Sequence, residues 1–504
     1  MKRAASILIM AALLAPQQAM ADKAFKFYGG GYGHGVGMSQ YGAYGLAKKG
    51  WSRSSIIRWY YKGTSLDTRN PPKSKFRVGL LQRRGSFTLR ARKDSFKLAI
   101  EGEGTVDTVA RDDSRRIVIS GGKYKIYDGD KLKGTFGASN ADLRALYTDT
   151  GAAVKVKQWG HKARRGHLEF NIVSSTRADL VAVVDPEQYL WGLGEVPSSW
   201  PMKTLEVQAD AGRTYAYRVV SGGNRTGCSC DILGDTRDQN YVGWDKEAGA
   251  DGDRWVKAVK NTAKQVITYG GDLTTTFYSS SSGGWVEAVG AVWGGSKPYL
   301  KASCDPGDYT GANPNRVWKS SLMGKSVARK LRSRYGWSIR RVTGITVTDR
   351  GKGGYVSEAR ITGKRVGGGT GSWMATGERL RVGLGLKSAR FWVNQNRLVK
   401  GAIRSKYDAL RCSPGLPRSG RKSTDGGVWQ KFRKGRIYSK SGAGTNYLHG
   451  LVLKKFVRKD GPGGPLGYPT TGVKKLSDGR LRTRFEHGKI VCTPSTGACK
   501  VKIA

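Results

Sequence analysis

No stretch of the 504-residue sequence is apolar for long enough to cross a membrane. A spanning helix needs about 20 consecutive apolar residues, whereas the apolar run near the N-terminus covers only Ile7 to Leu14. Two basic residues precede this run, and Ala19-Met20-Ala21 provides a small-x-small cleavage site after it. This pattern predicts a signal peptide over residues 1–21, and therefore a secreted protein whose mature chain begins near Asp22.

Acidic residues are scarce. The sequence has 38 Asp and Glu against 88 Lys and Arg, a formal net charge of +50 at pH 7. Such a charge attracts polyanions, and for an exported protein these are anionic wall polymers and acidic lipid headgroups. The charge is spread along the chain and does not gather in one arm or stripe, so we expect no nucleic acid as a partner. Solubility alone is the alternative explanation.

Only six cysteines are present, and in an exported chain they indicate disulfides. Cys492 and Cys499 bracket a short turn-forming segment and are expected to pair. Of the other four we favour a bond between Cys230 and Cys304, although spacing alone does not fix connectivity. A zinc site at Cys228-Ser229-Cys230 is the weaker alternative, because no second ligand pair follows at the usual spacing. We therefore expect no metal and no other cofactor.

The pattern of apolar residues predicts an α+β protein with a small β unit and a small β-rich module at the C-terminus. Helices are expected at Ser52–Tyr61, from Pro201 onward and at Trp255–Lys264. Strands are expected at Leu180–Val184, Gln265–Tyr269 and Phe391–Val393, and in short runs after Phe76. The predicted division is an N-terminal segment (22–75), a β unit (76–135), a mixed α/β domain (136–400), a linker (401–427) and a C-terminal module (428–504).

Glu195 is the candidate with the most informative setting. It is a single carboxylate among Leu193, Val196, Pro197 and Trp200. Apolar surroundings disfavour the charged form and raise the pKa of a carboxyl, as a general acid near neutral pH requires. The alternative is an ordinary solvated glutamate in a loop.

Two further segments are rich in small polar residues or glycine. Tyr278–Gly284 contains four serines, but it lacks the Gly-x-Ser-x-Gly spacing of a serine hydrolase and has no histidine nearby. Gly33–Ala43 is rich in glycine, but no Lys-Ser/Thr pair closes it as in a phosphate-binding loop. For His34 in this segment, a purely structural role is the alternative to ligand binding.

Together these segments resemble the SpoIID/LytB family of peptidoglycan proteins, over roughly residues 29–63 and 170–395. The resemblance rests on His34-Gly35-Val36-Gly37-Met38-Ser39-Gln40-Tyr41-Gly42-Ala43, Glu187-x-Tyr189-Leu190-x-Gly192-x-x-x-Glu195-x-Pro197, Gln208-Ala209-x-Ala211-x-Arg213-Thr214-Tyr215-Ala216, Asp235-Thr236, Gln239-x-Tyr241 and Phe277–Gly284. It implies a SpoIID-like mixed α/β domain whose ligand is the glycan strand of peptidoglycan.

The resemblance also implies roles for individual residues. Glu195 matches the catalytic acid/base of a lytic transglycosylase, which cleaves glycan strands stripped of their peptides. The residues expected to bind substrate are His34, Ser39, Gln40, Gln208, Arg213, Tyr278, Ser279 and Ser281. Among them, Arg213 is the expected partner of the lactyl carboxylate, because its guanidinium fork fits such a group.

Most glycosidases need two carboxylates, and none of Asp185, Asp210, Asp235 and Asp238 has a diagnostic setting as the second. One acid suffices when the 6-hydroxyl of N-acetylmuramic acid attacks its own anomeric carbon and forms a 1,6-anhydro ring. Glu195 would then protonate the bridging oxygen and later accept the hydroxyl proton.

Two features depart from the family pattern. The Gly-His-Gly motif precedes the domain, whereas in the best-known members it follows the last strand. We therefore expect residues 29–63 to fold back beside Phe391, as in a natural permutation. Asp210 stands where a small apolar residue is usual, and it is expected either to perturb Glu195 or to face solvent.

The C-terminal segment resembles LGFP repeats, with Leu466-Gly467-Tyr468-Pro469 as the core and Phe-x-x-Gly-x-Ile at Phe432 and again at Phe485. This resemblance implies a wall-anchoring module and a protein associated with the cell wall. The alternative function is a wall-binding protein that enhances a cell-wall amidase, which makes such an amidase a candidate partner.

Overall fold

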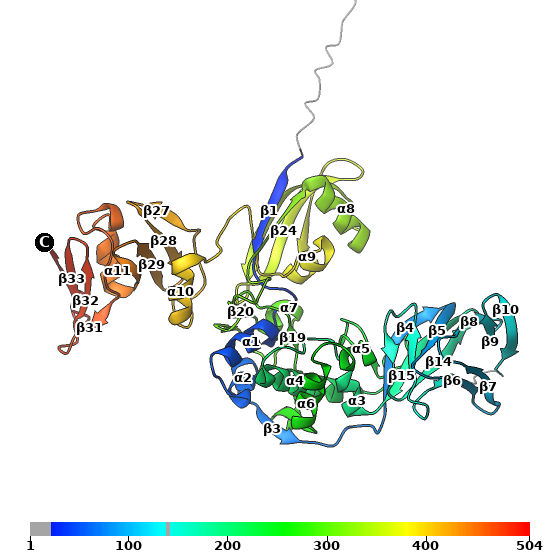
Figure 1. Ribbon diagram of the computed structural model, residues 1–504. Helices are drawn as coiled ribbons and strands as arrows, with labels where there is room; N and C mark the ends of the chain where they lie inside the picture. The colour runs from blue at the N-terminus through cyan, green and yellow to red at the C-terminus, as the bar shows by residue number, and fades with distance from the viewer. Residues whose placement is uncertain (1–21, 138–141) are drawn as a thin grey trace, which may run out of the picture.

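The computed structural model describes residues 22–137 and 142–504, and the predicted signal peptide lies outside these residues. The described chain mixes helices and strands and ends in two small β-sheets, as the α+β prediction requires. Figure 1 shows a central helical region between a β unit, a second α/β region and the C-terminal module. Among the described residues, no helix combines the length and apolar character needed to cross a membrane.

The β unit consists of two packed antiparallel sheets that share one core. The larger sheet contains β4 (Phe76–Arg84), β6 (Phe96–Ile100), β7 (Gly104–Val109), β11 (Leu143–Leu146), β14 (His167–Ser174), β15 (Arg177–Val184) and, parallel to β4, β16 (Ile232–Leu233). The second contains β5 (Ser86–Arg92), β8 (Ser114–Ser120), β9 (Lys123–Asp128), β10 (Lys131–Phe136), β12 (Ala153–Val156) and β13 (Lys162–Ala163). Because β11 pairs with both β6 and β14, the unit extends past the expected boundary at residue 135.

The central region is built around one long helix, α4 (Met202–Val220), of which most residues are buried. The sequence suggested that Pro201 is the first helical residue, but in the structure it is the N-cap residue of α4. The helices around it are α1 (Gln40–Lys48), α2 (Arg53–Tyr60), α3 (Pro186–Trp191), α5 (Trp244–Glu247), α6 (Gly252–Asn261) and α7 (Val289–Trp293). Ser52, the first residue of the helix expected at Ser52–Tyr61, caps α2, since its hydroxyl accepts a hydrogen bond from the Ser55 N–H.

Short strands join the N-terminal segment to this region. They are β2 (Met38–Ser39) with β19 (Tyr278–Ser279), and β3 (Ser65–Thr68) with β17 (Gln265–Tyr269), which also pairs with β18 (Asp272–Leu273). A further pair, β20 (Trp285–Val286) with β21 (Ser303–Cys304), lies within the central region. The parallel pairing of β2 with β19 brings the glycine-rich segment and the serine run side by side.

The N-terminal strand β1 (Ala24–Gly29) lies between β22 (Trp318–Met323) and β26 (Phe391–Val393). Gly29 pairs with Phe391, and Gly33 forms a bridge with Ser388. The segment that carries the Gly-His-Gly motif therefore lies beside the strand that it was expected to join. Gly35 has a φ of +75°, and a Cβ there would lie 2.0 Å from the Tyr355 ring, so only glycine fits.

A second α/β region follows, made of β23 (Ile339–Arg350), β24 (Val356–Arg365), β25 (Thr370–Ala375), α8 (Gly324–Tyr335) and α9 (Gly377–Leu384). Figure 1 shows it beside β1, above the central helices. Its core joins the two ends of the domain, because Phe25 and Phe27 are buried together with Phe391.

The expectation of a linker at residues 401–427 is wrong. The segment contains α10 (Gly401–Ala409) and β27 (Lys422–Thr424), and Ile403 and Tyr407 of α10 are buried against Phe432 and Ile437. The stretch rich in Ser, Gly, Pro and Arg that suggested a linker follows Cys412, beyond the end of α10, and forms turns and β27. The remaining elements are β28 (Gly427–Phe432), β29 (Gly435–Lys440), β30 (Gly444–Leu448), α11 (Gly450–Val457), the 3-10 helix η1 (Gly461–Gly463), β31 (Lys474–Lys475), β32 (Leu481–Phe485), β33 (Gly488–Cys492) and β34 (Cys499–Ile503).

The six cysteines form three disulfides. The bond between Cys492 and Cys499 is confirmed. The expected pairing of Cys230 with Cys304 is wrong, because Cys230 bonds to Cys228 and Cys304 bonds to Cys412. The Cys304–Cys412 bond spans 108 residues and ties the start of the C-terminal module to the central region.

Candidate active site

Glu195 lies on the turn between α3 and α4 and is fixed by a loop that follows β16. The Gly194 N–H donates to Asn240 O at 2.8 Å, and the Asn240 N–H donates to Glu195 Oε1 at 2.7 Å. Leu193 forms a bridge with Tyr241 on the same loop. Two segments about 45 residues apart in sequence are thus joined around the carboxyl group. The position of the carboxyl is therefore fixed by backbone groups of the protein.

Burial raises the pKa of Glu195 above its usual value. The Asn240 N–H, the Tyr278 hydroxyl, Gln40 and the charge of Lys246 act in the opposite direction without cancelling the effect of burial. The Asn240 N–H donates to Oε1 at 2.7 Å, whereas Gln40 Nε2 donates to Oε2 only across 3.5 Å, so Oε2 is the oxygen with the weaker contact and the better position for a proton. The carboxyl is thus set up as a proton donor.

A chain of hydrogen bonds orients the Tyr278 hydroxyl toward Glu195. The Tyr189 hydroxyl donates to Gln239 Oε1 at 2.9 Å, and Gln239 Nε2 donates to the Tyr278 hydroxyl oxygen at 2.8 Å. With its oxygen already accepting, the Tyr278 hydroxyl is free to donate its proton to Glu195. The chain therefore stabilises the ionised form of Glu195.

Gln40 joins the N-terminal segment to the site. It is the first residue of α1, and its Nε2 lies 3.3 Å from Gln208 Oε1 on α4 as well as close to Glu195. The glycine-rich segment therefore contributes directly to the surroundings of the carboxyl group.

Glu195 borders two cavities. One, of about 550 Å³, is lined by Tyr32, Gly33, His34, Gln40, Glu195, Tyr215, Thr236, Arg237, Asp238, Phe277, Tyr278, Ser279, Ser280, Trp293, Glu378 and Arg381. The other, of about 400 Å³, is lined by Gly194, Glu195, Val196, Pro197, Ser198, Val242, Asp245, Lys246, Gly249 and Ala250. A carboxyl group shared by two adjoining cavities can act on a bond within a chain that occupies both.

Other carboxylates near the site are occupied by cations or hydrogen bonds. Asp238 has a fully buried side chain and accepts hydrogen bonds from the Tyr215 hydroxyl, at 2.9 Å, and from Arg225. Asp235 pairs with Arg237 at 2.6 Å, and Glu378 pairs with Arg381 at 2.6 Å. Among the described residues that line the larger cavity, Glu195 is thus the acid without an ion-pair partner.

Four of the predicted substrate-binding residues line the larger cavity, namely His34, Gln40, Tyr278 and Ser279. The His34 ring packs 4.8 Å from the Trp293 ring, and its Nδ1 accepts a hydrogen bond from the Val36 N–H. Burial lowers the pKa of His34 to about 4, so the ring is neutral near pH 7 and its Nε2 can donate a hydrogen bond.

The other four lie behind the cavity wall. Ser39 and Ser281 both donate to the buried carboxylate of Asp308, at 2.8 Å and 3.1 Å. Gln208 is buried and reaches the site only through Gln40. These side chains support the wall that a ligand would touch.

The expectation that Arg213 binds the substrate is wrong. Its side chain is 0% exposed and forms a bidentate ion pair with Glu187, at 2.7 Å and 2.8 Å. It also donates to the backbone oxygens of Val259 and Gln265. A guanidinium in an interior pays too large a desolvation cost to stay unpaired, and here its partners belong to the protein.

Asp210 does not face solvent. Its buried carboxylate accepts two hydrogen bonds from Arg53, at 2.6 Å and 3.0 Å. Burial raises the pKa of Asp210 to about 7, against the opposing effect of Arg53. The acid at this position therefore ties α2 to α4.

Several cavity residues had no assigned role in the sequence. Tyr215 stood inside a matched motif, two residues after Arg213, and a helix turns far enough in two residues to direct it to the cavity. Phe277 and Trp293 form the aromatic wall, with ring centroids 4.9 Å apart. Arg237 and Arg381 supply positive charge, and no local pattern marked them.

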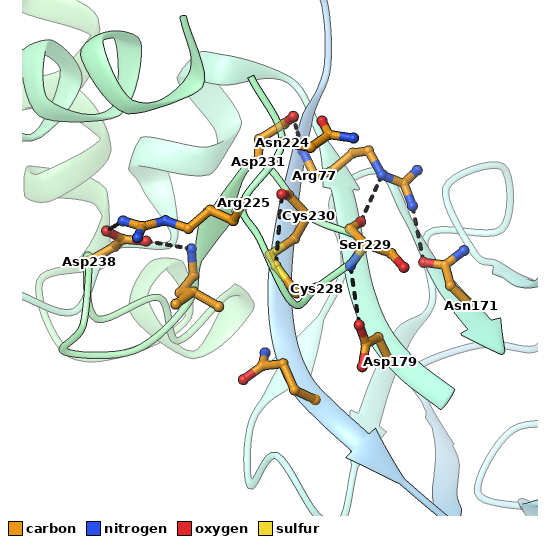
Figure 2. Close-up of a disulfide and its surroundings, with 12 residues drawn as sticks. Arg77, Asn171, Asp179, Asn224, Arg225, Cys228, Ser229, Cys230, Asp231 and Asp238 are labelled. Carbon is orange, nitrogen blue, oxygen red and sulfur yellow. Dashed lines mark hydrogen bonds and ion pairs between the residues drawn. A yellow bond between two sulfur atoms is a disulfide. The ribbon is translucent and has the colours of Figure 1, made fainter. Parts of the chain in front are cut away.

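The Cys228–Cys230 disulfide lies in the loop just before β16 (Figure 2). The Ser229 N–H between the two cysteines donates to Asp179 Oδ2 at 3.1 Å, which fastens the loop to β15. Arg225, just before the disulfide, reaches Asp238 in the cavity wall (Figure 2). The described residues contain no group of three His, Cys, Asp or Glu arranged to hold a metal ion.

Comparison with known proteins identifies two kinds of domain. Residues 174–269 match the model of SpoIID, stage II sporulation protein, and residues 415–464 and 466–504 match the LGFP repeat. The first LGFP match begins inside the segment expected to be a linker.

The chain is also similar to individual curated proteins. Over 114 residues it is 37% identical to the amidase enhancer of Bacillus subtilis (strain 168), which is 23% of this chain and 14% of that protein. Over 221 residues it is 24% identical to stage II sporulation protein D of Bacillus amyloliquefaciens, which is 42% of this chain and 60% of that protein. The chain thus spans less than two thirds of either relative. It contains a SpoIID domain, and LGFP repeats follow that domain.

Proposed function

We propose that this protein is a secreted, cell-wall-associated lytic transglycosylase that cleaves the bond between N-acetylmuramic acid and N-acetylglucosamine in peptide-stripped glycan strands. The observation that carries the proposal is Glu195, a carboxyl with a raised pKa at the boundary of two cavities. A glycan strand is a chain, and it can place sugars in both cavities with a glycosidic bond at Glu195.

In this mechanism Glu195 Oε2 donates its proton to the glycosidic oxygen, and the bond from that oxygen to C1 of N-acetylmuramic acid breaks. The 6-hydroxyl of the same sugar attacks C1, and its proton passes to the Glu195 carboxylate. The products are a 1,6-anhydro end and a free 4-hydroxyl, and Glu195 returns to its protonated state. No second protein carboxylate is required, which agrees with the ion pairs that occupy Asp235 and Glu378.

Since Arg213 is buried, the lactyl carboxylates of the strand need other partners. Arg237 and Arg381 line the larger cavity, and both retain donors beyond their ion pairs with Asp235 and Glu378. The aromatic wall of Phe277 and Trp293 offers the apolar surface on which a sugar ring packs.

The test is digestion of amidase-treated peptidoglycan by the full chain, with mass spectrometry of the released fragments. Fragments that end in 1,6-anhydro-muramic acid support the proposal, whereas fragments with only reducing ends indicate a hydrolase. The name of the Bacillus subtilis relative, amidase enhancer, favours a second candidate function. In that case the chain releases no fragments by itself but increases release by a wall amidase.

A further inference from the structure

Another cavity lies away from Glu195, where the second α/β region meets the C-terminal module. Its volume is about 740 Å³. The end of β23 and the β26 region form one wall, and Leu416–Arg418 with Arg433 forms the other. We call it the junction cavity, and none of its lining residues borders the cavities at Glu195.

Positive side chains dominate the junction cavity. Four arginines and one lysine line it together with a single carboxylate: Arg350, Lys352, Arg397, Arg418, Arg433 and Asp349. Asp349 accepts a hydrogen bond from the Ser357 hydroxyl at 2.6 Å. Among the described residues, none of the five cations has a carboxylate within ion-pair distance.

The interior of the cavity is held positive by the fold. Arg350 donates to the backbone oxygens of Gly354 and Phe391, at 2.9 Å and 2.7 Å, and Arg390 donates to those of Gly353 and Gly283. Both guanidinium groups lie against the Trp392 ring, 5.3 Å and 5.4 Å from its centroid. Burial and the neighbouring charges of Arg390 and Arg397 lower the pKa of Arg350 to about 10, so it remains protonated at pH 7.

A second acid near the cavity, Glu287, is not among its lining residues. Glu287 is fully buried on the far side of the Gly351–Tyr355 loop, where its carboxyl accepts hydrogen bonds from the N–H groups of Gly353 and Tyr355. The five cations of the cavity therefore face one carboxylate, that of Asp349, and this excess of positive charge favours binding of an anion from solution.

Both walls are fixed relative to each other before any ligand arrives. The Cys304–Cys412 disulfide ends four residues before Leu416, and Trp285 donates to the Tyr407 hydroxyl at 2.8 Å across the same boundary. A preformed cavity avoids the entropic cost of bringing the two modules together on binding.

We propose that the junction cavity binds a segment of a phosphodiester-linked polymer of the cell wall. Four of the five cations are arginines, whose planar fork matches the two free oxygens of a phosphodiester. A polymer with one such group in each repeat supplies several anions to a cavity with several cations. A membrane surface is a poorer partner, because these cations line a recess between two modules and do not project from a convex face.

The experiment is calorimetric titration of the full chain with a synthetic hexamer of glycerol phosphate, with hexagalacturonate and with phosphatidylglycerol vesicles. Arg418→Gln/Arg433→Gln removes two exposed cavity cations, and Arg332→Gln/Arg334→Gln removes the same charge from exposed positions on α8. We expect the first variant to weaken binding of the hexamer about tenfold or more, because two charge-assisted contacts are lost, and the second less than about twofold.

Four results would overturn the proposal. They are no binding of the hexamer by the unaltered chain, an equal loss in both variants, an equal affinity for hexagalacturonate with the same dependence on Arg418 and Arg433, and an effect of these arginines on vesicle binding alone. The equal loss would assign binding to the overall charge of the protein.

Discussion

The backbone N–H of Asn240 points at Oε1 of Glu195 across 2.7 Å. This contact distinguishes the two oxygens of one carboxyl group, since Oε1 accepts a short hydrogen bond from the backbone while Oε2 has only the 3.5 Å contact with Gln40 Nε2. It depends on backbone and not on a side chain, so it survives substitution at position 240. The proposed chemistry requires such an arrangement, because one group must first give and then take a proton.

Removal of the Tyr278 hydroxyl is expected to change the pH dependence of turnover. That hydroxyl lowers the pKa of Glu195 by donating to its carboxylate, so Tyr278→Phe raises this pKa further. A general acid is active while protonated, and activity therefore falls as pH rises through the pKa. The alkaline limb of kcat in the variant should move to higher pH, as measured by fragment release from pH 4 to 9.

Tyr215→Phe is the matched control for that variant. The Tyr215 hydroxyl lines the same cavity but donates to Asp238 and not to Glu195. Its pH profile should keep the position of the unaltered protein, whatever happens to the rate. A similar displacement in both variants would argue against a specific contact between Tyr278 and Glu195.

The Arg53–Asp210 pair is expected to affect stability mainly because removal of one partner leaves a buried charge without an ion-pair partner at hydrogen-bond distance. After Arg53→Ala, the ion-pair partner left to the buried Asp210 carboxylate is Arg213, whose Nη1 lies 3.8 Å from Oδ1. The variant should lower the free energy of unfolding by about 3 kcal/mol. Arg53→Ala/Asp210→Asn should recover part of this loss. Urea unfolding at pH 8, above the pKa of about 7 for Asp210, measures both.

The same pair gives a dependence on pH. Folding raises the pKa of Asp210 above its unfolded value, so the folded state binds the proton more tightly and stability falls as pH rises from about 4 to 7. The slope attributable to this group should disappear in Asp210→Asn. If Arg53→Ala were more stable at pH 8 than Arg53→Ala/Asp210→Asn, the result would contradict the account of the pair.

The two longer-range disulfides are expected to differ in their effect on stability. Cys304–Cys412 closes a loop of 108 residues, and its removal as a double serine variant should cost about 4 to 5 kcal/mol. Cys492–Cys499 closes a loop of seven residues and should cost less than about 3 kcal/mol. Urea unfolding followed by tryptophan fluorescence tests the order, and a larger effect of the shorter loop would contradict it.

Removal of the LGFP repeats is expected to separate wall retention from turnover. Because α10 packs on Phe432 and Ile437, a truncation at Cys412 would expose that packing face, so the better end point is Asn396 with Cys304→Ser. This variant should sediment less with insoluble wall but keep most of its activity on soluble glycan. Equal losses of retention and turnover would argue against a separate anchoring module.

The sequence predicted a raised pKa for Glu195 from its apolar neighbours in the chain, and Leu193 and Val196 are indeed buried. It did not predict the polar partners of the carboxyl, because Gln40, Asn240 and Tyr278 come from distant segments. It predicted the path of the N-terminal segment for a different reason, since a motif out of its usual order can satisfy the same contacts only by lying beside Phe391. Both inferences required little knowledge of distant packing.

Arg213 and the cysteines show where such reasoning ends. A motif places Arg213 on α4 but does not say which face of that helix meets the cavity, and the answer depends on Glu187 and the α6 region. Similarly, spacing does not reveal that α10 returns Cys412 to Cys304. The sequence suggested a linker at residues 401–427 because the stretch after Cys412 is rich in Ser, Gly, Pro and Arg, and it does not show that α10 packs against Phe432 and Ile437.

The most direct test of the central claim is Glu195→Gln in the full chain, assayed for 1,6-anhydro ends on amidase-treated peptidoglycan. Glutamine keeps the shape and can still accept the Asn240 N–H, but it has no acidic proton to donate. The account predicts loss of fragment release with unchanged retention on insoluble wall. Release at the rate of the unaltered protein would contradict it.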